Sequence, residues 1–287
     1  MTETKKTAKP RQRASTATTP TAREPAAILE PEHWEELKVA HEHLEHPSLA
    51  VRLSNVVGTP IEIALHLLPR QWYQYLHSTA EAAIAKVLEA AISTMHVGVQ
   101  PIAHDYFYKG LVIGTGAIGG FLGPWALLAE LPITTTIILR SIADIARSEG
   151  ESLDSLDTQL ACAQVFALGG RSEEDDAADT GYYGVRLALT LPFAQARQHV
   201  VEKGLTDNGG PVIASLISVV STRFGVSLSQ KVAVQLVPVI GAITGALINT
   251  IFINHFQDIA KSHFTVRRLE RQYGAELVQA AYESLSR

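Results

Sequence analysis

The spacing of apolar residues predicts a helix over residues 31–46. Leu37, Ala40 and Leu44 recur at intervals of three and four, which places them on one face of an α-helix. Polar residues fill the other positions of this segment, and Pro47 ends it. This segment is therefore expected to pack through one stripe against the rest of the protein.

Two further segments show the same periodicity. Apolar residues recur at helical spacing up to Met95, and Ser78 or Thr79 is expected to cap the start of that helix. Residues 158–168 form a second apolar segment, which Gly169 is expected to end. Both segments favour buried or half-buried helices.

The rest of the chain favours the all-α class. Residues 256–282 contain no proline and a single glycine, Gly274. No alternating stretches bounded by hairpin dipeptides recur along the chain, which argues against an all-β fold. We therefore predict a helical bundle in a single domain over residues 28–287, preceded by a disordered tail over residues 1–27.

Two long apolar segments are expected to be helical and contain glycine. Residues 110–139 carry Glu130 as their only charge, and residues 232–254 carry none. Both exceed the roughly 20 residues that span a bilayer. Prolines, among them Pro132 and Pro238, interrupt them, and proline costs about 3 kcal/mol inside a helix. Central helices of a bundle and hairpins that enter one leaflet both remain open.

Glycines in these segments recur four residues apart. On a helix this spacing clears one face, so that a second backbone can approach closely. Such packing occurs in soluble bundles and between helices at or in lipid. The glycines predicted to mediate helix packing or membrane contact are Gly110, Gly114, Gly116, Gly119, Gly120, Gly123, Gly241 and Gly245.

Residues 114–119 also spell GxGxxG, the opening of a dinucleotide-binding unit. In that alternative, residues 133–139 would form the second strand. No further β-α-β unit follows, so the glycines fit helix packing better.

Composition and charge limit the classes of function that the protein can have. The chain has 287 residues, of which 46% are apolar and 18% charged, against roughly 25% charged in an ordinary soluble domain. Residues 1–27 carry a formal charge of +4 and the remainder −9. An acidic body argues against a nucleic-acid partner. The tail has no apolar core of a secretory signal; it is either a solvated arm or a basic segment attracted to anionic lipid.

No metal site or cofactor is expected. Residues 41–46 read HEHLEH, in which the second histidine of a zinc-binding HExxH motif is missing, so they are interpreted as a solvated polar face. The acidic run over residues 172–179 lacks the pattern of a calcium loop. Cys162 is interpreted as a small core residue. Neither a GxSxG motif nor a Walker A motif occurs.

Polar residues within or beside the apolar segments form a candidate interior network. Arg186 and Asn249 would need polar partners if buried, and Asp144 or Asp258 is expected to supply the neutralising carboxylate. Alternatively, each side chain reaches water independently. The full candidate set is Arg140, Asp144, Tyr182, Arg186, Asn249, His255 and Asp258. Arg140, Asp144 and Arg147 are also spaced as an ion-pair ladder on one helix face.

Several segments, in this order, resemble the bacterial EcsC family. They read GTGAIGGFLGPWALLAELPITTTIILRSIADIARSEG, CAQVFALGG, GYYGVRLAL and LVPVIGAITGALINTIFINHFQDIAKSHFTVRRLERQYG. The resemblance covers roughly residues 89–282 and excludes the basic tail. It implies a helical, membrane-associated protein at the cytoplasmic side of a bacterial inner membrane. It supplies no catalytic residue.

Two functions follow from these observations. The first is a protein without enzymatic activity that docks, through its glycine-rich helices, on lipid or on an ABC transporter or secretion component. The second is a membrane-proximal hydrolase that acts on lipid or peptide. Pairing with a second copy of the chain is compatible with both. A cleft that gathers the candidate polar residues would favour the enzyme.

Overall fold

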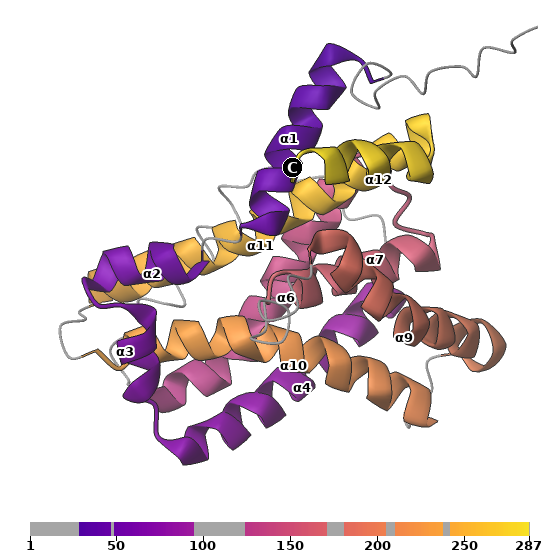
Figure 1. The fold of residues 1–287 in the computed structure, drawn as a ribbon. Coiled ribbons are helices and arrows are strands. Elements are labelled where there is room, and N and C mark those ends of the chain that lie inside the picture. Colours follow the sequence, from indigo (N-terminus) through magenta and orange to yellow (C-terminus); the bar gives the residue numbers. More distant parts are fainter. Residues whose placement is uncertain are drawn as a thin grey trace, which may run out of the picture.

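The computed structural model describes residues 29–46, 49–94, 124–170, 181–204, 210–237 and 242–286. Within these ranges every regular element is an α-helix, which confirms the predicted class (Figure 1). The helices are α1 (Pro31–Glu45), α2 (Leu49–Val57), α3 (Ile61–His66), α4 (Arg70–Thr94), α6 (Pro124–Ser148), α7 (Leu156–Leu168), α9 (Tyr182–Lys203), α10 (Gly210–Gln235), α11 (Ala242–Tyr273) and α12 (Ala275–Ser284).

Helix α7 lies at the centre of the bundle. Ten of its thirteen residues are buried, and among the other three only Asp157, in the first turn, is exposed. It contacts α4, α6, α9, α10 and α11. A helix that is apolar all round is stable in water only when neighbours cover it, and these five helices do so. Cys162 is fully buried among them, as the sequence predicted.

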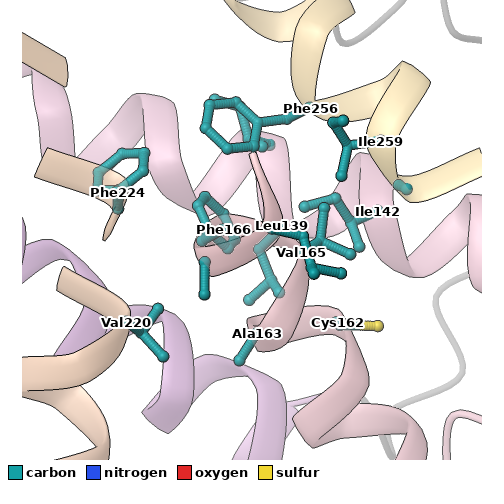
Figure 2. Close-up of a cluster of buried hydrophobic side chains, with 14 of the residues drawn as sticks. Leu139, Ile142, Cys162, Ala163, Val165, Phe166, Val220, Phe224, Phe256 and Ile259 are labelled. Atoms are coloured by element: carbon teal, nitrogen blue, oxygen red, sulfur yellow. The ribbon is translucent and has the colours of Figure 1, made fainter. Parts of the chain in front are cut away.

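Aromatic rings join α7 to its neighbours (Figure 2). Phe166 of α7 lies between Phe224 of α10 and Phe256 of α11, with both ring centroids 5.4 Å away. Phe252, one turn before Phe256, extends the cluster. Fully burying a phenylalanine contributes about 1.5–3 kcal/mol, so this cluster holds three helices together.

Helices α6 and α11 run in the same direction. Gln257 donates to Ser141 at 2.6 Å, and further along both helices Arg268 contacts Glu149 at 2.7 Å. Their N-termini therefore lie at the same end of the bundle. Helix α2 contacts α11 and helix α3 contacts α10 at that end (Figure 1).

The first predicted helix is confirmed. Helix α1 buries Leu37, Ala40 and Leu44 on one face. The second begins earlier than predicted, because α4 starts at Arg70 and not at Ser78 or Thr79. Both hydroxyls lie inside the helix and donate to the carbonyl of Tyr75. Trp72 and Leu76 continue the buried stripe toward the N-terminus, so the helix is longer than the expected cap implied.

The second apolar segment is not one helix. Residues 232–254 are divided between the end of α10 at Gln235 and the start of α11 at Ala242. Of the first segment, the structure describes the part from Pro124, which is helical through Pro132. One described helix, α10, is long and apolar enough to cross a membrane.

The second strand that a dinucleotide-binding unit would need is not formed. Residues 133–139 lie within α6 and are helical. The GxGxxG residues themselves lie outside the described ranges, as do the basic tail, Gly241, the acidic run over residues 172–179 and the six glycines from Gly110 to Gly123.

The chain turns sharply after α7, and this turn generates the first prediction. A Cβ atom on Gly170 would lie 1.9 Å from the backbone oxygen of Arg223 in α10. In contrast, a Cβ on Gly225, within α10, would meet nothing within 4 Å. We expect Gly170→Ala to lower the free energy of unfolding by at least about 2 kcal/mol, because backbone must shift. Gly225→Ala should raise it by roughly 0.5–1 kcal/mol. Urea denaturation measures both, and equal stabilities would contradict the close approach.

Candidate functional site

The predicted polar residues fall into separate groups. Arg186 and Tyr182 lie together on α9, whereas Asp258 and His255 lie together on α11. Asn249, also on α11, is fully buried and 21 residues before Glu270, about 30 Å along the helix. Arg186, which Glu270 binds, and Asn249 therefore do not share one network.

Glu270 of α11 is the carboxylate that neutralises Arg186, rather than Asp144 or Asp258. The two Nη atoms of Arg186 donate to the two carboxylate oxygens at 2.7 and 3.0 Å. The Tyr183 hydroxyl donates to the same carboxylate at 2.9 Å. Burial opposes the charge on Arg186, but Tyr182 and Glu270 raise its pKa above its ordinary value. The guanidinium therefore stays charged and fixed in a bidentate geometry.

Two tyrosine hydroxyls extend this group into the interior. The Tyr182 hydroxyl lies 2.8 Å from Nδ1 of His263, and burial raises the pKa of Tyr182 and lowers that of His263. Tyr282 of α12 donates to Glu45 at 2.9 Å, and Glu45 also accepts from the backbone N–H of Tyr182 at 3.0 Å. These bonds attach the start of α9 to α1, α11 and α12.

A second buried carboxylate, Glu151, precedes α7. Its side chain is 6% exposed and accepts from Arg267 at 2.8 Å, from Thr158 at 2.9 Å and from Arg271. Burial alone would raise the pKa of Glu151, but the hydrogen bonds and charge of Arg267 lower it below its ordinary value. Glu151 is therefore ionised and holds the C-terminal part of α11 against the start of α7.

A cleft of about 410 Å³ opens between α7 and α9. Three guanidinium groups line it: Arg186 and Arg197 of α9 and Arg267 of α11. Its remaining lining residues are Asp157, Leu160, Ala161, Gln164, Thr190, Phe193 and Ala194. The volume falls within the range of small-molecule sites.

His255 caps the end of α7. Its Nε2 donates to the carbonyl of Gly169 at 2.7 Å, and the Ser227 hydroxyl donates to the same oxygen at 2.9 Å. Burial lowers the pKa of His255 to about 4. Asp258 pairs with Arg52 of α2 at 2.9 Å. This group satisfies a helix terminus and fixes α2.

The ladder on α6 is partly formed. Arg147 pairs with Asp144 at 3.1 Å, and Arg140 is exposed on the same helix.

Of the predicted packing glycines, Gly245 is described and is buried in α11. His41 and His43 contact the hydroxyls of Ser286 and Ser262. Among the described residues, no three His, Cys, Asp or Glu side chains are placed to hold a metal ion.

Exposed apolar side chains occur on α3, α4 and α9. Four of them, here called the α3–α4 surface, lie on α3, in the residue after it and in the first turns of α4: Ile63, Leu67, Tyr73 and Tyr75. On α9, Leu187 and Leu191 are 74% and 65% exposed. Large exposed apolar side chains that cluster mark interaction sites.

Sequence reasoning missed the carboxylates that organise the polar groups. Glu45, Glu151 and Glu270 lie in charged segments that read as solvated, and their arginine and tyrosine partners are 84 to 237 residues away. The run RRLERQY over residues 267–273 was the available signal, because several arginines beside a buried helical stripe need acceptors.

The partly buried pair of Arg186 and Glu270 generates a prediction on stability. Glu270→Gln should lower the free energy of unfolding by about 2–3 kcal/mol, because it leaves Arg186 without a carboxylate in a poorly hydrated position. Arg147→Gln removes an exposed pair and should cost less than about 1 kcal/mol. Equal costs in urea denaturation would show that Arg186 is hydrated well enough to need no partner.

The low pKa of His255 generates a prediction on pH. The unfolded state binds a proton near pH 6.5, whereas the folded state does so only near pH 4. The free energy of unfolding should therefore fall as pH decreases from 6.5 toward 4, by up to about 3 kcal/mol from this residue. His255→Gln should reduce this dependence, although it costs stability at neutral pH. Exposed His77→Gln is the control, and an unchanged pH dependence in His255→Gln would contradict the assignment.

Comparison with known proteins agrees with the segments quoted from the sequence. The chain matches the model of the EcsC protein family over residues 31–269, which includes every described helix from α1 to most of α11. No curated protein and no solved structure matches the chain. Because the matched residues make up most of the chain, the protein belongs to the EcsC protein family.

Proposed function

We propose that this protein docks on a lipid membrane from the aqueous side, through the α3–α4 surface. The observation that carries the proposal is the two-sided character of α3. Ile61 and Ala64 are buried against the bundle, whereas Ile63 and Leu67, the residue after α3, are 53% and 50% exposed. A short helix that exposes large apolar side chains beside its buried ones has a reason to contact something outside its own bundle.

Aromatic residues beside α3 support a lipid partner. Tyr73 and Tyr75, in the first turns of α4, are each nearly half exposed. Tyrosine is enriched at membrane interfaces, where its ring lies at the level of the headgroups. Arg70 is exposed at the start of the same helix and carries a charge that anionic headgroups attract.

The position of this surface adds a second line of support. Helix α3 contacts α10, and α2 contacts α11, at the end of the bundle where α10 finishes and α6 and α11 begin (Figure 1). Leu247, close to the start of α11, is also exposed. Both apolar segments of the sequence therefore reach the same end that presents the α3–α4 surface.

Peripheral docking fits the bundle better than a spanning helix does. Helix α10 is apolar enough to cross a membrane, but it contacts α2, α3, α4, α7 and α9. Withdrawing it would expose Phe224 and the rest of the aromatic cluster to water. Interfacial docking needs no such rearrangement.

Vesicle flotation tests the proposal. The wild-type chain should float with vesicles that contain phosphatidylglycerol, and Ile63→Glu with Leu67→Glu should weaken binding at least tenfold, because each side chain contributes about 1.5 kcal/mol or more when it enters an apolar phase. Val201→Glu is the matched control, since Val201 is also exposed but lies on α9. It should bind as the wild type does.

Three outcomes contradict lipid docking at this surface. One is absence of wild-type binding, and another is an equal loss in Val201→Glu. The third is binding to native inner-membrane vesicles but not to protein-free vesicles, which would assign the surface to a membrane protein such as an ABC transporter.

A further inference from the structure

We propose that the cleft between α7 and α9 binds a small amphipathic anion, a phosphate or carboxylate group that carries a short alkyl or acyl chain. This inference goes beyond membrane docking, because the cleft and the α3–α4 surface share no element. It rests on three arginines that line the cleft, on the apolar residues beside them and on the size of the cleft.

Two of the three arginines are held before any ligand arrives. Arg186 is fixed by Glu270 and Arg267 by Glu151, whereas the pair of Arg197 with Asp157 at 2.6 Å is more than half exposed. Glu270 and Glu151 are not among the residues that line the cleft. A ligand therefore meets donors whose side-chain freedom is already restricted, which lowers the entropic cost of binding.

The ion pairs that hold the arginines use only some of the guanidinium N–H groups. A guanidinium group has five N–H bonds. Glu270 receives two from Arg186 and Glu151 two from Arg267, while one nitrogen of Arg197 pairs with Asp157. Three arginines and one aspartate line the cleft, and Glu270 and Glu151 neutralise two of these arginines from outside the lining. Arginine matches the geometry of phosphate and carboxylate oxygens, so an anion is the ligand that these donors select.

The other residues that line the cleft favour a ligand with an apolar part. Leu160 and Ala161 of α7 and Phe193 and Ala194 of α9 line the same cleft. Leu187 and Leu191 each follow a lining residue by one position, about 100° further round α9, and both are exposed. An inorganic anion would leave this wall unused, and a neutral amphiphile would leave the guanidinium groups unused.

Titration calorimetry with octyl phosphate, below the concentration at which it forms micelles, tests the site. We expect one molecule to bind per chain. Ala194→Trp should weaken binding at least tenfold, because the indole fills the cleft without changing its charge. Arg197→Gln should weaken binding severalfold, and its loss is tolerable for folding because its pair with Asp157 is exposed.

Matched controls separate the cleft from the surrounding surface. Gln195→Trp places the same indole on the adjacent exposed position, which does not line the cleft, and should bind octyl phosphate as the wild type does. Ile63→Glu should also bind normally, so that failure of this proposal and failure of membrane docking are distinguishable.

A comparison of ligands tests which chemical groups the cleft recognises. Octyl glucoside binding as tightly as octyl phosphate would overturn the role of the arginines, and inorganic phosphate binding equally well would overturn the role of the apolar wall. Unchanged affinity in Ala194→Trp would place the ligand elsewhere and overturn the proposal. Competition by vesicles that contain phosphatidic acid would support a lipid headgroup as the source of the anion, and its absence would support a soluble amphiphile.

Discussion

The structure depends on covering the apolar side chains of α7. A helix with ten of thirteen residues buried has no stable position at a surface, and five neighbours enclose it. This constraint explains why a glycine ends α7 and a second follows, since a Cβ on Gly169 would overlap Phe256 and one on Gly170 would overlap the backbone of α10. It also explains why His255 and Ser227 supply donors to the last carbonyl, because a helix end that is buried needs partners from the protein.

Enclosing α7 brings charged residues close to the core, and three carboxylates among them have partners at a long sequence separation. Glu270 accepts hydrogen bonds from Arg186 of α9 and Glu151 from Arg267 of α11. Glu45 accepts from the Tyr282 hydroxyl and from a backbone N–H. Losing one partner of such a pair costs more than the pair contributes, so these groups specify one arrangement of α1, α9, α11 and α12. The same bonds fix the guanidinium groups of the cleft, so structural pairing and the proposed anion binding rest on common residues.

The sequence predicted the structural features that depend on residues close together in the chain. The stripe of Leu37, Ala40 and Leu44 and the apolar run before Gly169 appear as helices where expected, because periodicity reflects burial directly. The start of α4 was misplaced, since Ser78 and Thr79 are capping residue types that also occur inside helices. The partner of Arg186 was not predictable, because the choice of Glu270 over Asp144 or Asp258 depends on how α9 packs on α11.

The two proposed sites lie far apart, and this separation bears on how they could act together. Helix α10 contacts α3 toward one end and α9 toward the other, and its 26 residues extend about 39 Å (Figure 1). On α11, exposed Leu247 and cleft residue Arg267 are likewise separated by about 30 Å. That distance is comparable to the thickness of a bilayer core. If the chain docks through α3 and α4 with α11 along the membrane normal, the cleft lies well above the membrane surface, where an amphiphile dissolved in the aqueous phase reaches it more readily than a lipid of that membrane does.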